Sequence, residues 1–407
     1  MLTINLYKWT AIFSCVYLIF ALNPFVLWLT WPPLLNVPVY IIVFICSMAL
    51  LGRKKLLFTG ERIALSVLIF LFSFHINLPF TSEYSDYGRA FAFAILLLIV
   101  FFPVDILVQI LRYFIKFHIF ICFWSVIVFF LAAITELPHL QIKNATAILQ
   151  ETDHYYRLYG FIVSSTNTVY NIGGFSIGRI CGIYPEPGHF ATYIGFLIIA
   201  QKLLFNRVSK IFFVAGALTF SPVFYISLLL LIGYNVAVKK DAKSIRNYFI
   251  YTTLLFVVLF FIGDVFRDQL WELAFGRNLT GGIESRLDER ADRLALSHYE
   301  SFIKTPEVWV GKGVTYVEEL GIFSDFRGFI FKYGILGLVL SLSITLFLIY
   351  NSKSFPYITL LFPFAFLIYF QRSWMFGSIY VYMMYFILLM YFRYVNASQK
   401  LQNFENG

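Results

Sequence analysis

Residues 178–191 combine a rigidly held acid with a nearby arginine. Their sequence is Gly-Arg-Ile-Cys-Gly-Ile-Tyr-Pro-Glu-Pro-Gly-His-Phe-Ala, so that Glu186 lies between two prolines at the start of an apolar run. An acid at the edge of a membrane span is costly unless it is paired or hydrated, which makes Glu186 a candidate catalytic residue and Arg179 a candidate ligand for an anion. The alternative is that Glu186 only begins a helix, where a negative charge is favourable.

A row of arginines is the second candidate. Residues 284–303 are predicted to form an amphipathic helix, with an apolar face made of Leu287, Ala291, Leu294, Ala295, His298 and Phe302. Arg286, Arg290 and Arg293 recur at i, i+4 and i+7 and share another face. Because guanidinium groups bind phosphate oxygens through a fork of donors, this row is a candidate for binding phosphate groups. The alternative is a solvated helix with internal ion pairs.

The other candidates are single residues. Asp325 is a candidate general base, while His189, His298 and Arg372 are candidate substrate-binding residues. His75 and His118 lie in or beside apolar runs and are interpreted as packed or interfacial residues. No His, Cys or Asp spacing indicates a metal site, and no metal or cofactor is predicted.

The composition indicates which class of protein contains these candidate residues. Of 407 residues, 60% are hydrophobic and 13% are charged, about half the charged share of a typical soluble protein. The net charge of +9 does not indicate a nucleic-acid partner, because many of the Lys and Arg residues flank apolar runs. We therefore predict an all-α, polytopic integral membrane protein in which residues 1–407 form a single transmembrane domain.

The apolar runs predict about twelve transmembrane helices. Pro222 divides the stretch 210–238 into two short helices, which places the basic clusters on either side of it on one face. The N- and C-termini are then cytoplasmic, and the two long loops, 135–188 and 264–327, are periplasmic and are expected to form short helices. The predicted spans are 9–29, 35–51, 63–79, 89–104, 117–134, 189–205, 210–220, 222–238, 248–263, 328–350, 355–370 and 378–392.

Several blocks of sequence, in order over about residues 175–340, resemble the O-antigen polymerase (Wzy-type) family, within the O-antigen ligase and polymerase superfamily. The blocks are Arg179-x-x-Gly182-x-x-x-Glu186-Pro187-Gly188-x-Phe190-Ala191, then Leu218–Ser221, then the closing blocks Pro306–Gly313, Asp325–Phe329 and Lys332–Gly337. The first five predicted spans carry no motif of this family.

The resemblance implies a glycosyltransferase that polymerises surface polysaccharide on the periplasmic face of the bacterial inner membrane. Its donor is a chain on undecaprenyl diphosphate and its acceptor is one lipid-linked repeat unit. Membrane lipid and a chain-length regulator protein are the implied partners, and no cofactor is implied. We favour Asp325 as the base that activates the acceptor hydroxyl and Glu186 as its positioning partner.

Three alternatives remain from the sequence. An O-antigen ligase transfers the polymer to the lipid A core, but related ligases usually carry a His-Asn pair where this chain has Asp325. A flippase or other transporter for lipid-linked oligosaccharide concentrates its ionisable residues inside the spans, whereas here they gather in two loops. The third alternative is a structural scaffold of an envelope assembly.

Overall fold

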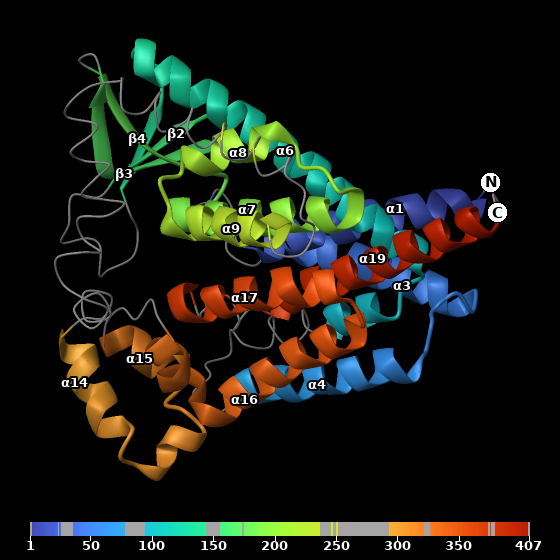
Figure 1. The fold of residues 1–407 in the computed structure, drawn as a ribbon. Coiled ribbons are helices and arrows are strands. Elements are labelled where there is room, and N and C mark those ends of the chain that lie inside the picture. The colour runs from blue at the N-terminus through green and yellow to red at the C-terminus, as the bar shows by residue number, and fades with distance from the viewer. Residues whose placement is uncertain are drawn as a thin grey trace.

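The computed structural model describes residues 2–22, 24–25, 36–77, 94–143, 155–172, 175–236, 246, 250, 293–320, 326–372, 375 and 379–405. This part of the chain is mostly helical (Figure 1). Its helices are α1 (Leu2–Ala21), α3 (Asn36–Gly52), α4 (Gly60–Asn77), α6 (Val104–Ile134), α7 (Pro187–Phe205), α8 (Lys210–Ala217), α9 (Pro222–Tyr234), α14 (Arg293–Phe302), the 3-10 helix η5 (Pro306–Trp309), α15 (Val314–Leu320), α16 (Phe326–Ser352), α17 (Phe355–Arg372) and α19 (Ile379–Glu405).

Several described helices have the length and composition of membrane spans. Val104–Ala132, Pro187–Phe205 and Phe326–Ser352 are each long and apolar enough to cross a bilayer, and shorter apolar helices accompany them. The predicted membrane character is therefore supported. The predicted count of twelve spans is not established by the described residues, and the predicted span 248–263 lies outside them apart from residue 250.

Helix α6 is longer than its predicted span. The prediction began at residue 117 because Arg112 and Lys116 interrupt the apolar run, whereas α6 begins at Val104 and has 31 residues. Arg112 is accommodated because its Nε donates a hydrogen bond to the Tyr391 hydroxyl of α19 at 2.7 Å, and its guanidinium lies over the Tyr391 ring.

A four-stranded sheet corrects the all-α prediction. The first long loop folds into β1 (Leu140–Lys143), β2 (Tyr155–Tyr159), β3 (Ile162–Ile172) and β4 (Phe175–Gly182), rather than into short helices. The strands form an antiparallel meander in sequence order, and Gly160, with φ +65°, helps to make the tight β2–β3 turn. Strand β3 reads Ile-Val-Ser-Ser-Thr-Asn-Thr-Val-Tyr-Asn-Ile, and its many β-branched residues favour a strand.

The predicted break in the stretch 210–238 is confirmed. Helix α8 ends at Ala217 and α9 begins at Pro222, so the chain turns between two short helices. Pro222 occupies the first turn of α9, where the missing N–H costs nothing. Phe220 adopts a left-handed backbone conformation with φ +48° within this turn.

The molecule has two distinct ends in Figure 1. The sheet end carries β1–β4, the start of α7, and α14 with α15. The terminal end carries both chain termini and the α3–α4 turn. Between them α7, almost entirely buried, packs against α8, α9, α17, α19 and β4 and forms the centre of the bundle.

Candidate functional site at the sheet end

Arg179 of β4 joins two of the sequence blocks described above. Its Nε donates to the carbonyl of Thr219 at 3.0 Å and its Nη2 to the carbonyl of Phe220 at 2.9 Å. These carbonyls follow the end of α8, where helical partners run out, so the guanidinium caps the negative end of the helix. The turn that it caps is buried, with Thr219 fully enclosed.

The start of α7 fixes the position of Glu186. This residue is the N-cap, with extended φ/ψ of −136° and 143°, and Pro187 follows in the first turn. Its backbone carbonyl accepts from the amides of His189 and Phe190, and its side chain is exposed. Glu186 therefore begins the helix, as one interpretation predicted, and it is also flanked by prolines at a fixed position, as the other predicted. Burial raises the pKa of the nearby Tyr156 phenol, with contributions from Cys181 and Glu186.

A buried aromatic cluster packs beside the Pro185-Glu186-Pro187 segment. Tyr184 is fully buried and its hydroxyl lies 2.7 Å from Nε2 of His118 on α6. Nδ1 of His118 lies 2.9 Å from the Phe114 carbonyl, which can only accept, so Nδ1 carries the ring proton and Nε2 accepts from Tyr184. Burial raises the pKa of the Tyr184 phenol well above its usual range, which keeps it a neutral donor. The pair therefore ties the Pro-Glu-Pro segment to α6.

His189 belongs to the same cluster. It is 2% exposed, its ring stacks on Tyr193 at a centroid distance of 5.4 Å, and Tyr184 lies 5.5 Å away. The Tyr193 hydroxyl is 3.4 Å from its Nε2. Because it is packed inside the bundle, His189 is placed to support the start of α7 rather than to contact a ligand at the surface.

Helix ends of both signs contribute to the electrostatics of the sheet end. Helices α7 and α9 begin there, at Pro187 and at Pro222, and their positive dipole ends favour an anion, whereas α8 ends there with its negative end. Arg179 adds a positive charge, part of which is engaged by the two carbonyls after α8. A half-buried guanidinium beside two helix N-termini can stabilise negative charge that develops on a leaving group such as a diphosphate.

The described part of the second long loop, residues 293–320, forms a helical unit. Tyr299 and Phe302 of α14 pack with Val317 of α15 and Phe331 of α16, and Ala295 of α14 is buried. Leu294 and His298, which were predicted to share the apolar face, are exposed instead. The buried face is rotated from the predicted one because Tyr299 rather than His298 faces the cluster.

Helix α16 is broken where it meets this unit. Gly334 has φ 67° and ψ −178°, a conformation essentially restricted to glycine. The amides of Lys312 and Gly313 donate to the carbonyls of Phe331 and Lys332, at 2.8 and 3.0 Å. A Cβ on Gly311 would lie 2.4 Å from the Lys332 oxygen, and one on Gly334 would lie 2.5 Å from the Trp309 carbonyl. Two of the three closing blocks, Pro306–Gly313 and Lys332–Gly337, therefore interlock through their backbones.

Nε2 of His75 on α4 lies 2.7 Å from the Tyr333 carbonyl at this break. The histidine therefore links the lower part of the bundle to the interlocked backbones. This is more specific than the packed or interfacial role predicted for it.

The predicted site residues are only partly brought together. Arg179, Glu186 and His189 gather around β4 and the start of α7. His298 lies on α14, at the opposite corner of the sheet end in Figure 1, with its Nδ1 3.3 Å from the Tyr316 hydroxyl. Arg293 begins α14 and Arg372 ends α17, while Asp325, Arg286 and Arg290 lie outside the described residues.

Sequence reasoning missed Tyr184 and Arg327, and it missed the hydrogen bond of His118, which was interpreted only as a packed or interfacial residue. Tyr184 and His118 form a hydrogen bond that connects distant segments, and no local pattern shows such a bond. Arg327 lies in the first turn of α16 and is only 9% exposed. Its signal was present in the sequence, because an arginine beside an apolar run is costly to bury and is a candidate by default.

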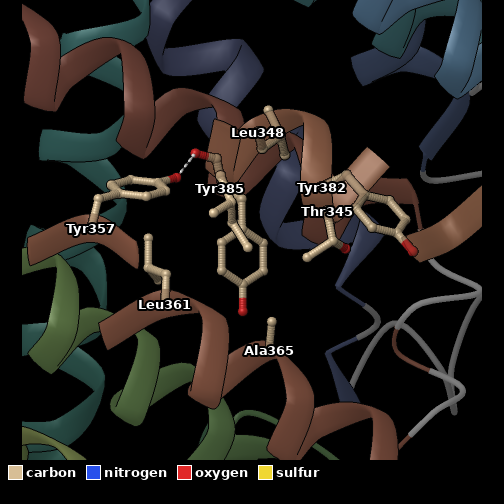
Figure 2. A pocket seen from close by; sticks show the side chains of 8 residues that line it. Thr345, Leu348, Tyr357, Leu361, Ala365, Tyr382 and Tyr385 are labelled. Atoms are coloured by element: carbon tan, nitrogen blue, oxygen red, sulfur yellow. Dashed lines mark hydrogen bonds between the residues drawn. The ribbon is translucent and has the colours of Figure 1, made fainter. Parts of the chain in front are cut away.

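A small cavity deeper in the bundle is not part of this site. Thr345, Leu348, Tyr357, Leu361, Ala365, Tyr382 and Tyr385 line it, together with Ile349 (Figure 2). Its volume of about 10 Å³ is at the lower limit for one water molecule. The Tyr357 hydroxyl donates to the Tyr385 carbonyl at 2.9 Å, which ties α17 to α19.

The sequence matches no family model and no curated protein, and the fold matches no solved structure.

Proposed function

We propose that this protein is a polymerase of lipid-linked oligosaccharide, which joins undecaprenyl-diphosphate-linked repeat units into a surface polysaccharide. It would be an enzyme of the bacterial inner membrane, with about twelve spans, cytoplasmic termini, and the sheet end on the periplasmic face. A chain-length regulator protein would be its partner, and O-antigen is the product class that the sequence resemblance favours.

One observation carries the proposal. Arg179 and the turn at Thr219 and Phe220 belong to different blocks of the family resemblance, about 40 residues apart, and they meet through two hydrogen bonds. A fortuitous likeness would give no reason for such blocks to be in contact. The contact also lies beside the N-termini of α7 and α9, where a leaving diphosphate would be stabilised.

The proposed reaction is a single glycosyl transfer. A hydroxyl of the acceptor repeat unit attacks the anomeric carbon of the donor chain, and its proton passes to a carboxylate, for which we favour Asp325. The bond between the anomeric carbon and the diphosphate oxygen breaks, and its electron pair leaves with undecaprenyl diphosphate. Arg179 would lower the barrier by stabilising that developing charge, and Glu186 would position the reacting groups.

Deletion of the gene in its bacterial host tests the proposal, with gel analysis of the lipopolysaccharide. A polymerase deletion is expected to leave the core carrying one repeat unit, and a plasmid copy should restore the ladder. Bare core with accumulated lipid-linked polymer would instead identify a ligase. A complete lack of exported repeat units would identify a flippase, and an unchanged ladder would reject all three functions.

An assay with purified components separates the chemistry from export. The full-length protein in lipid nanodiscs receives the host's undecaprenyl-diphosphate-linked repeat unit, and the products are resolved by mass. Stepwise growth with release of undecaprenyl diphosphate is expected. Arg179→Ala should slow growth by about a hundredfold if the guanidinium stabilises the leaving group, while the matched variant Arg53→Ala, in the exposed α3–α4 turn at the other end, should not.

A further inference from the structure

The terminal end carries a polar hollow that the proposed glycosyl transfer does not use. It lies between the α16–α17 turn and α19 and has a volume of about 510 Å³, within the range of small-molecule sites. Its polar lining comes from Ser352, Lys353, Ser354, Arg393 and Asn396. It opens at the end opposite Arg179 and the sheet.

The hollow carries two basic side chains. Lys353 and Arg393 line it, and none of the described lining residues is acidic. Arg393 is held in place because its Nη1 donates to both carboxylate oxygens of Glu61, at 2.9 and 2.8 Å, and its Nη2 donates to the Asn351 carbonyl. Lys353 is exposed, and among the described residues no acidic side chain pairs with it. The Glu61 carboxylate offsets the charge of Arg393, so Lys353 supplies the net positive charge of the hollow.

Two neighbouring features indicate a lipid rather than a soluble ligand. Tyr350 and Leu346 lie one turn apart on α16, just before the turn, and are 79% and 54% exposed. Exposed apolar side chains on a membrane-spanning helix face acyl chains, and a tyrosine near a helix end is typical of the headgroup level. The hollow therefore lies where the headgroup of a lipid packed along α16 would be.

We propose that this hollow binds the phosphate of an anionic phospholipid headgroup. Lys353 supplies the main attraction, since basic groups at the membrane surface attract anionic lipids. The Ser354 hydroxyl and the Asn396 amide offer hydrogen bonds to phosphate or headgroup oxygens. Arg393 shapes the wall while it holds α4, α16 and α19 together.

The chain offers a matched control in Lys54. Both Lys353 and Lys54 are exposed, both lie in turns that join two helices, and both have left-handed backbones, with φ of 47° and 55°. Only Lys353 lines the hollow. Glycine is the preferred residue in this conformation, so Lys353→Gly and Lys54→Gly each remove one charge while relieving backbone strain.

The test is native mass spectrometry of the detergent-purified full-length protein, titrated with phosphatidylglycerol or with phosphatidylcholine of the same chain length. The wild type should bind one phosphatidylglycerol more tightly than phosphatidylcholine. Lys353→Gly should weaken that first binding step about fivefold, the effect of one lysine near an anionic headgroup. Lys54→Gly should leave it unchanged.

Three results would overturn the proposal. Equal weakening in both glycine variants would mean that general surface charge attracts the lipid, and weakening in neither would mean that Lys353 does not contribute to binding. Competition by millimolar inorganic phosphate, with no preference between the two lipids, would identify a soluble phosphate as the ligand. Because both variants should fold at least as well as the wild type, gel filtration provides the control for integrity.

Discussion

The two units at the sheet end are attached to the bundle in different ways. The sheet is held by side chains: Arg179 binds the α8–α9 turn, and Tyr184, just after β4, binds His118 of α6. Its residues Ile162 and Ile180 also join the main core. The α14–α15 unit shares a small core with Phe331 of α16 and is attached in addition by backbone contact, where Gly311 and Gly334 approach the opposing chain closely.

This difference predicts that the two attachments respond differently to substitution. Side-chain contacts can be weakened in steps, because a shorter or less charged residue keeps part of the interaction. A backbone interlock has no intermediate form, because any Cβ collides with the facing chain. We therefore expect graded effects around Arg179 and all-or-none effects around Gly334.

The largest effect is expected for Gly334→Ala. The new Cβ would lie 2.5 Å from the Trp309 carbonyl, and the backbone has φ 67°. Strain and collision together should lower the free energy of unfolding by at least about 3 kcal/mol. Thermal unfolding of the purified protein measures this loss. Gly233→Ala is the control, because no atom lies within 4 Å of its Cβ position; equal melting temperatures for the two variants would remove the distinction between the units.

The next effect is a graded series at Arg179. Arg179→Ala removes the bonds to two carbonyls of a buried turn and should cost about 2–3 kcal/mol of stability. Arg179→Lys should recover part of this loss, because an ammonium can bind one carbonyl but cannot span both. The same thermal assay applies. If Arg179→Lys is no more stable than Arg179→Ala, the guanidinium contact is as intolerant of substitution as Gly334. The proposed difference between side-chain and backbone attachment would then be wrong.

A smaller effect should appear as coupling between His118 and Tyr184. His118→Phe leaves the buried Tyr184 hydroxyl without its acceptor, and Tyr184→Phe leaves the imidazole without its donor. Each single change should cost about 1–3 kcal/mol, whereas the double variant should cost about 1 kcal/mol less than their sum. Additive losses in the double-mutant cycle would mean that the 2.7 Å contact does not stabilise the protein.

The smallest effect is expected for His75, whose side chain binds the Tyr333 carbonyl beside the backbone interlock. His75→Leu should cost about 1 kcal/mol, because the Tyr333 carbonyl loses its bond. His75→Gln should restore most of it, since its amide can donate from a similar position. Limited proteolysis between residues 293 and 333 provides a second measurement. Faster cleavage in His75→Leu but not in His75→Gln would show that a side-chain hydrogen bond also helps to attach the α14–α15 unit.

Local signals explain what could be predicted from the sequence. Pro222 and the flanking basic residues identified the α8–α9 break, and Pro187 with Glu186 identified the start of α7. The sheet was missed because the first long loop was judged by its polarity, although the Val, Ile, Thr and Tyr residues of β3 favour a strand. The contacts of Arg179 with Thr219 and of His118 with Tyr184 span 40 and 66 residues, and no spacing rule reaches that far.

Helix α8 has consequences for how the protein is made. Its eight residues rise only about 12 Å, against a hydrocarbon thickness of about 30 Å. The turn after it leaves carbonyls without helical partners, and lipid could not satisfy them. Arg179, which satisfies two of them, is synthesised about 40 residues earlier. We therefore expect the β3–β4 hairpin to be folded before the α8–α9 hairpin is released into the bilayer, so that the earlier element provides the docking site that the later one requires.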